Sequence, residues 1–176
     1  MLTRITGAIV LLIVATVNGM AMDACDTVRV EGLNILGIKL GMGYADVQTA
    51  VGPGLKVKRP KNGQGSFFQN FIDQPAAGKL AGVRALFLRF YQDKVYQIEV
   101  FYEESGQQGT LVALTTRLSS DLNLSPDVWT IKNGRAAIAC GTMSLNADNI
   151  LNPHVELTDE AASSAFKAKT GGKKSK

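Results

Sequence analysis

Residues 84–102 read RALFLRFYQDKVYQIEVFY, and this stretch decides the fold. Apolar side chains recur at every second position in both of its halves. Because side chains two positions apart share one face of a strand, the pattern predicts two antiparallel strands, 84–91 and 95–102. The apolar face of the pair would consist of Leu86, Leu88, Phe90, Tyr96, Ile98, Val100 and Tyr102.

The loop between these strands is predicted from the same alternation. For both apolar sets to lie on one face, the numbers of paired residues must add to an even value, which requires a loop with an odd number of residues. The tripeptide 92–94, Gln-Asp-Lys, satisfies this condition. The pairing then places Phe90 opposite Tyr96 and Leu88 opposite Ile98.

The opposite face of this hairpin is not plainly exposed to solvent, because it carries aromatic side chains as well as polar ones. Arg89 would lie diagonal to Glu99 on this face. Aromatic and arginine side chains dominate binding hot spots, so either a second layer of the protein or a binding partner should cover part of the surface. The candidate binding face consists of Phe87, Arg89, Tyr91 and Phe101.

A short amphipathic helix is expected at 44–51, within the glycine-rich stretch 37–54. Its apolar residues are spaced as one face of a helix requires, and they are Val47, Ala50 and Val51. Gly52 suits the left-handed position that ends a helix, and Pro53 prevents its continuation. Two helical turns are not stable alone, so this helix must pack on a sheet.

A second, longer helix is expected at 110–122, where leucines recur at steps of three and four residues. Beyond it, Asn133-Gly134 is typical of a two-residue hairpin turn, and Thr158-Asp159 would begin a short alanine-rich helix. The other strands that the alternation and the turn residues predict are 28–30, 55–59, 66–72, 127–132, 135–146 and 154–157.

The two helices divide the chain into halves of similar order, because each helix is followed by strands. We therefore expect an α+β fold with an antiparallel β-sheet, helices packed on one face, and two tandem helix-plus-meander halves. Both halves would belong to a single domain over 22–166, because a mature chain of about 155 residues, from Met22 onwards, suffices for one hydrophobic core and is too short for two ordinary domains. A different strand order in the two halves would refute the repeat.

One part of this layout resembles a known kind of domain. The pattern Gly-Met-x4-Val-x3-Val-Gly-x-Gly at 41–54 is followed by FLRFYQDKV at 87–95 and by IEV at 98–100. It resembles the helix-then-meander unit of BamE-like (SmpA/OmlA) proteins and of β-lactamase-inhibitor-like domains, over about 60 residues, 41–100. The resemblance implies an α+β sheet scaffold that binds proteins or envelope components without chemistry of its own.

The first 21 residues have the organisation of a secretory signal peptide. Arg4 supplies a positive charge, an uninterrupted apolar segment spans 8–17, and the small-residue triplet 19–21 suits signal peptidase. A membrane anchor is the alternative, but the apolar run is about half of the roughly 20 residues that cross a bilayer. We therefore expect cleavage near Ala21 and a periplasmic or secreted protein.

Cys25 and Cys140 are the only cysteines, and export would place them where thiols oxidise. A lipid anchor on Cys25 is disfavoured because the preceding triplet, 22–24, contains Asp23. We therefore expect a disulfide between Cys25 and Cys140, which would close a loop of more than 100 residues. Two free buried thiols and an intermolecular bond are the alternatives.

The formal charge of +4 overstates how basic the folded part is. Arg4 lies in the leader and five lysines lie in the segment 167–176, so 13 of the 19 basic residues remain against 15 acidic ones, a balance of −2. A nucleic-acid-binding face is therefore not expected. The segment 167–176 should be a disordered basic tail, either simply solvated or in contact with anionic membrane surfaces.

No constellation of residues in the sequence indicates catalysis or a cofactor. His154 is the only histidine, which argues against a multi-histidine metal site. A nucleophilic pair of Cys140 and His154 is disfavoured because Cys140 lies in an apolar strand. We therefore expect a non-enzymatic protein, without cofactor or metal, that binds a protein or an envelope component through the candidate binding face. The alternative is a small-ligand carrier or weak hydrolase with a pocket between helix 110–122 and the sheet.

Overall fold

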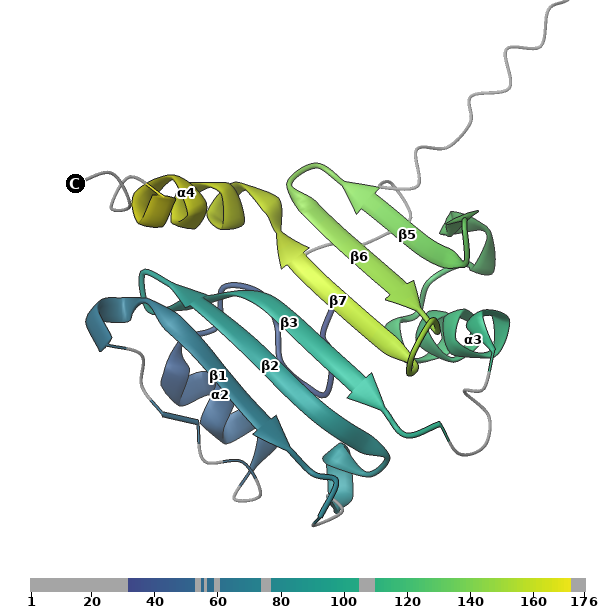
Figure 1. The fold of residues 1–176 in the computed structure, drawn as a ribbon, viewed down its shortest axis with the longest axis horizontal. Coiled ribbons are helices and arrows are strands. Elements are labelled where there is room, and N and C mark those ends of the chain that lie inside the picture. Colours follow the sequence, from purple (N-terminus) through teal and green to yellow (C-terminus); the bar gives the residue numbers. More distant parts are fainter. Residues whose placement is uncertain are drawn as a thin grey trace, which may run out of the picture.

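The computed structural model describes residues 32–52, 55, 57–58, 61–73, 77–104 and 110–171. Within these ranges the chain forms one seven-stranded antiparallel sheet with three α-helices, which confirms the α+β prediction (Figure 1). The strands are β1 (Gly65–Asn70), β2 (Val83–Tyr91), β3 (Lys94–Tyr102), β4 (Thr130–Lys132), β5 (Arg135–Cys140), β6 (Met143–Asp148) and β7 (His154–Asp159). The α-helices are α2 (Tyr44–Val51), α3 (Leu111–Leu122) and α4 (Glu160–Gly171), with short 3₁₀ turns η2 (Lys61–Gly63), η3 (Gly78–Leu80) and η4 (Pro126–Val128).

The sheet consists of two meanders that meet at their last strands. The strand order is β1-β2-β3-β7-β6-β5-β4, so β3 and β7 lie side by side in the middle (Figure 1). The first meander follows α2 and the second follows α3. In each half, three consecutive strands run in chain order from the edge of the sheet towards its middle: β1-β2-β3 in the first half and β5-β6-β7 in the second. The second half has one additional strand, β4, at its edge. The expected layout of two tandem halves is therefore confirmed.

The hydrophobic core lies between one face of the sheet and the helices α2 and α3. Two cross-strand rows form its sheet side: Leu88, Ile98, Leu157, Leu145 and Ile138 in one, and Leu86, Val100, Val155, Ala147 and Ala136 in the other. Each of these side chains is at most 2% exposed. The helices add the buried residues Val47, Val51, Leu114 and Leu118. The apolar stripes predicted for both helices therefore face the sheet.

The turn of the β2–β3 hairpin differs from the prediction. Tyr91 pairs with Lys94, so the loop contains two residues, Gln92 and Asp93, rather than three. Both have positive φ, 53° and 61°, as the hairpin turn that matches strand twist requires. A register shift between Arg89 and Phe90 makes up for the missing loop residue. A β-bulge, and not a three-residue loop, thus brings the apolar side chains of both strands onto one face.

The bulge changes which side chains enter the core. Leu88 lies opposite Ile98 as predicted, but Phe90 lies opposite Val95 instead of Tyr96. Val95 joins the core cluster, whereas Tyr96 packs against Phe166 of α4, with ring centroids 5.6 Å apart. The prediction that Tyr96 shares the face of Ile98 is therefore wrong, because a bulge places two consecutive residues opposite one.

Local hydrogen bonds set the beginnings of the three helices. The carboxylate of Asp46 accepts a hydrogen bond from the backbone of Gly43 at 3.0 Å, before α2. The hydroxyl of Thr110 accepts one from the backbone of Ala113 at 3.1 Å, before α3. For α4 the cap is Asp159, whose Oδ1 accepts from the backbone of Ala161 at 3.0 Å. The predicted bounds of α2 are confirmed, and α3 begins one residue later than predicted, at Leu111.

The last helix requires two corrections to the predicted architecture. α4 ends at Gly171, so residues 167–171 of the expected tail are helical, and the rest of that segment lies outside the described residues. Its Phe166 contacts Tyr91 and Tyr96, on the sheet face away from the core. The helices α2 and α3 share one face as predicted, and α4 covers one end of the other face. The apolar contacts of Phe166 stabilise this basic segment as a helix.

Other predicted strands also differ from the structure or fall outside it. Leu55 and Val57 are buried, but they lie outside the sheet, where the backbone of Val57 donates to the side chain of Gln48 at 3.1 Å. The predicted strand 135–146 is two strands, because the chain reverses at Gly141, whose φ is +57°. The strand expected at 28–30 lies outside the described residues.

Candidate functional site

The sheet face away from the core, which we call the outer face, brings together side chains from both halves of the chain. Strand registers place Phe87, Glu99, Glu156 and Asn146 in one cross-strand row. Phe101, His154, Asp148 and Arg135 form the next row. An aromatic region over β1, β2 and β3 therefore adjoins a charged region over β3, β7, β6 and the start of β5.

The aromatic region is a continuous run of ring contacts. The ring centroids of Phe68 and Phe87 are 4.2 Å apart. The centroids of Phe87 and Phe101 are 6.0 Å apart, and these two rings meet edge to face. Phe101 in turn stacks on His154, with centroids 4.5 Å apart and an interplanar angle of 19°. Such pairs contribute about 0.5–1.5 kcal/mol each beyond their burial. Phe68, at the edge of the run, remains 52% exposed.

The structure divides the candidate binding face into two parts. Phe87 and Phe101 belong to the aromatic run. Arg89 is exposed and interacts instead with Tyr96, while Tyr91 packs against Phe166 and lies 6.0 Å from the ammonium group of Lys169. Of the two explanations offered for the aromatic face, the second layer is present at one end as α4, whereas a partner at the other end stays a prediction.

The charged region is centred on His154. Its Nε2 lies 3.2 Å from Glu99 Oε1, and its Nδ1 lies 3.6 Å from Asp148 Oδ2. Arg135 Nε approaches the same oxygen of Asp148 at 3.9 Å. A cavity of about 330 Å³ opens beside these groups and is lined by Arg135, Asn146, Ala147, Asp148, His154 and Glu156.

Opposing effects act on the pKa of His154. Burial of the ring disfavours the charged form and lowers the pKa, but the carboxylates of Glu99 and Asp148 favour it and prevail. The pKa of His154 is therefore raised above its ordinary value. Nε2 is buried and lies at ion-pair distance from Glu99 Oε1, 3.2 Å away.

Sequence reasoning missed three residues of this cluster: Glu99, Asp148 and Glu156 were not singled out as site residues. A signal was present, because the alternation that places Phe87 and Phe101 on the outer face places Glu99 there too. The partners on β6 and β7 become visible only once β3 is known to pair with β7.

The nucleophilic pair considered from sequence does not form. Cys140 is buried at the end of β5 opposite Met143, whereas His154 lies opposite Asp148 at the other end of β6. Five strand residues separate these positions, roughly 17 Å at the usual rise. Cys25 lies outside the described residues, so its disulfide with Cys140 stays a prediction.

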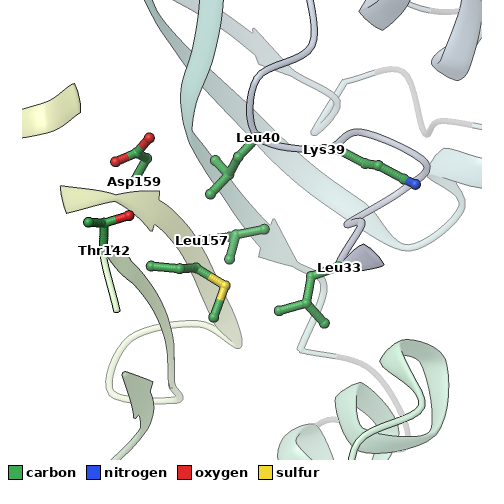
Figure 2. A pocket seen from close by; sticks show the side chains of 7 residues that line it. Leu33, Lys39, Leu40, Thr142, Leu157 and Asp159 are labelled. Carbon is green, nitrogen blue, oxygen red and sulfur yellow. The ribbon is translucent and has the colours of Figure 1, made fainter. Parts of the chain in front are cut away.

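A pocket was expected between α3 and the sheet, and the side chains of α3 that face the sheet there include Leu114 and Leu118, which are only 1% and 4% exposed. A cavity of about 170 Å³ lies elsewhere, between the segment 33–40 and the adjoining ends of β6 and β7 (Figure 2). Its walls are mainly Leu33, Leu40, Met143 and Leu157. Ligand pockets commonly measure about 300–1,000 Å³, so this cavity is small for a carrier.

Two further observations concern the whole chain. None of the helices in the described ranges combines the length and the apolar character that crossing a bilayer requires. Comparisons of the chain with protein-family models, with curated proteins and with solved structures give no match.

Proposed function

We propose that this is a non-enzymatic exported protein, periplasmic or secreted, that binds a protein partner of the cell envelope through its outer face. The observation that carries the proposal is the run of ring contacts from Phe68 to His154, on a part of the sheet where Phe68 remains 52% exposed among the described residues. Aromatic side chains bury large areas at a small entropic cost, which makes them frequent anchors of interfaces.

The charges beside the aromatic run suggest what the partner presents. Glu99, Asp148 and Glu156 supply three carboxylates, against Arg135 and the titratable His154. A partner with an apolar anchor flanked by lysine or arginine side chains would complement this surface. Charges at the rim of an interface chiefly direct association, so most of the affinity should come from the aromatic residues.

Sequence features add support of a weaker kind. The leader-like residues 1–21 favour export, although they lie outside the described part of the chain. The helix-then-meander order on which the resemblance to BamE-like and β-lactamase-inhibitor-like domains rests recurs in both halves. Because one fold serves many functions, this likeness raises the expectation of a binding scaffold and does not identify the partner.

A pull-down with matched variants tests the proposal. The chain from residue 22 onwards would be immobilised and exposed to envelope extract, alongside Phe68→Ser, Phe87→Ser and a control, Val112→Ser. Val112 is 67% exposed on α3, the helix that packs on the core side of the sheet rather than on its outer face. It therefore controls for a general loss of exposed apolar surface. We expect the two phenylalanine variants to lose at least about tenfold in recovery of a discrete protein. Equal recovery by all four proteins would overturn the proposal.

A further inference from the structure

Three side chains on the two central strands offer metal-ligating atoms close together. Glu99 on β3 and His154 and Glu156 on β7 each contribute one such atom, all within 4.8 Å of one another. Glu99 and Glu156 face each other across the strand pair, and His154 lies two residues before Glu156 on the same face. The ligands are thus carried by paired strands rather than by loops, which favours a defined geometry.

The spacing of these atoms suits a tetrahedral metal. Zinc binds imidazole nitrogen and carboxylate oxygen at about 2.0–2.2 Å, so two ligand atoms at a tetrahedral site lie about 3.3–3.5 Å apart. His154 Nε2 and Glu99 Oε1 are already 3.2 Å apart. A carboxylate oxygen of Glu156 lies within 4.8 Å of the ligand atoms of the other two residues, and Glu156 Oε1 accepts a 3.1 Å hydrogen bond from the hydroxyl of Thr158.

The ring nitrogens of His154 are unequal in a way that suits a ligand. Nδ1 faces Asp148 Oδ2 at 3.6 Å, whereas Nε2 is buried and faces Glu99 Oε1, one of the other candidate ligands, at 3.2 Å. Metal-binding histidines usually direct the other nitrogen at a carboxylate, which orients the ring. Asp148 would take this orienting role and leave Nε2 directed at the metal.

The negative charges of this cluster also favour a bound cation. Glu99 and Glu156 are direct cross-strand neighbours, and like charges so placed destabilise a sheet. Asp148 adds a third carboxylate, while Arg135 approaches only Asp148, at 3.9 Å, and His154 approaches Glu99 and Asp148. A divalent cation between Glu99, His154 and Glu156 would replace this repulsion with attraction.

We propose that Glu99, His154 and Glu156 bind a divalent transition-metal ion, for which Zn²⁺ is the best match, with Asp148 orienting the histidine. One imidazole with two carboxylates suits zinc, whereas calcium and magnesium prefer sites made of oxygen ligands alone. Three protein ligands leave a fourth position for water or for a side chain of another molecule. The site does not depend on the proposed protein partner, although it adjoins the aromatic run through the stacking of Phe101 on His154.

Binding would be measured by calorimetric titration of ZnCl₂ into the untagged, chelator-treated chain from residue 22 onwards, with MgCl₂ as a comparison. We expect one Zn²⁺ per chain and weaker or no binding of Mg²⁺. His154→Ala should weaken Zn²⁺ binding by more than about 100-fold, and Asp148→Asn by about 10- to 100-fold, the range seen when an orienting partner is removed. The control Asp127→Asn removes an exposed carboxylate outside the cluster and should change nothing.

A second measurement does not depend on variants that fold. Because His154 is the only histidine, its imidazole nitrogens give one pair of ¹⁵N resonances without assignment. Added ZnCl₂ should shift the Nε2 resonance while Nδ1 stays protonated. Wild-type protein that binds no Zn²⁺, or binding that leaves the imidazole resonances unmoved, would overturn the proposal. Neither result would bear on the aromatic run, so the two proposals fail separately.

Discussion

Glu99 lies directly opposite Glu156 across the pair of strands that joins the two halves of the sheet. Each half contributes one carboxylate to this contact, and His154 approaches Glu99 from the same strand as Glu156. The middle of the outer face therefore carries a like-charge pair that core packing alone does not require. The neighbouring aromatic run makes the same surface suitable for a partner.

The like-charge pair predicts that Glu156→Gln raises the free energy of unfolding in chelator but leaves the protein less stable than the wild type in ZnCl₂. Glu156→Gln keeps an oxygen that accepts from Thr158 and removes one negative charge. In chelator, its free energy of unfolding should rise by about 0.2–1 kcal/mol, because cross-strand repulsion is relieved. In ZnCl₂, the wild type should be the more stable protein, because it binds the ion more tightly. Urea unfolding in both solutions measures this, and a variant that is less stable in chelator would contradict it.

Docking of α4 should depend on one aromatic side chain. Phe166 contacts both Tyr91 and Tyr96, so Phe166→Ala should lower the free energy of unfolding by about 1–2 kcal/mol, as expected for a half-buried ring. The exposed Ser164 provides the control, since Ser164→Ala should change stability by less than about 0.5 kcal/mol. Denaturant unfolding and amide exchange over α4 would show the difference, and unchanged protection of α4 in Phe166→Ala would argue against this contact.

Tyr102 should make stability depend on alkaline pH. Burial raises its pKa to about 12, and Arg117, whose guanidinium lies 5.6 Å from the ring, opposes the rise in part. In the unfolded chain a tyrosine loses its proton near pH 10. From about pH 10 to 12 the unfolded state therefore gains a stabilisation that the folded state lacks, and the free energy of unfolding falls as pH rises.

The Tyr102→Phe variant isolates this effect, because phenylalanine cannot ionise. The stability of the wild type relative to the variant should be constant below about pH 9 and should fall by about 2–3 kcal/mol by pH 12, as two pKa units imply. Urea unfolding at each pH gives the difference, and the other tyrosines cancel in it. A difference that does not change with pH would show that Tyr102 ionises normally.

The two cysteines of the sequence predict one disulfide. Non-reducing peptide mapping should recover the peptide that contains Cys25 linked to the one that contains Cys140. Closure of so long a loop should stabilise the fold by about 4–5 kcal/mol on the chain-entropy model, so reduction should lower the midpoint of urea unfolding. Two thiols that alkylate without prior reduction would exclude the bond.

Sequence patterns predicted the local elements well and the hairpin turn less well. Alternation located β2 and β3 and paired Leu88 with Ile98, because it reports which side chains share a face. It missed the two-residue turn, since Gln92 and Asp93 are not the Asn-Gly pair that usually marks one. Tertiary contact supports this turn: the backbone of Asp93 donates to Gly63 at 2.9 Å.

The charged cluster could not be predicted from the same patterns. It requires β3 to pair with β7, the last strands of the two meanders, which are separated in the chain by α3 and by β4 to β6. Alternation assigns side chains to faces but does not say which distant strands are neighbours. Treating 135–146 as one strand also left out the reversal at Gly141, which places Asp148 opposite Arg135.

The most direct test of the outer face as a binding surface is cross-linking in intact cells. A photoreactive benzoylphenylalanine would replace Phe68 in one strain and Val112 in another, both positions being more than half exposed. We predict a discrete cross-linked protein from position 68 and none from position 112. The absence of any adduct from position 68, or the same adducts from both positions, would contradict the central claim.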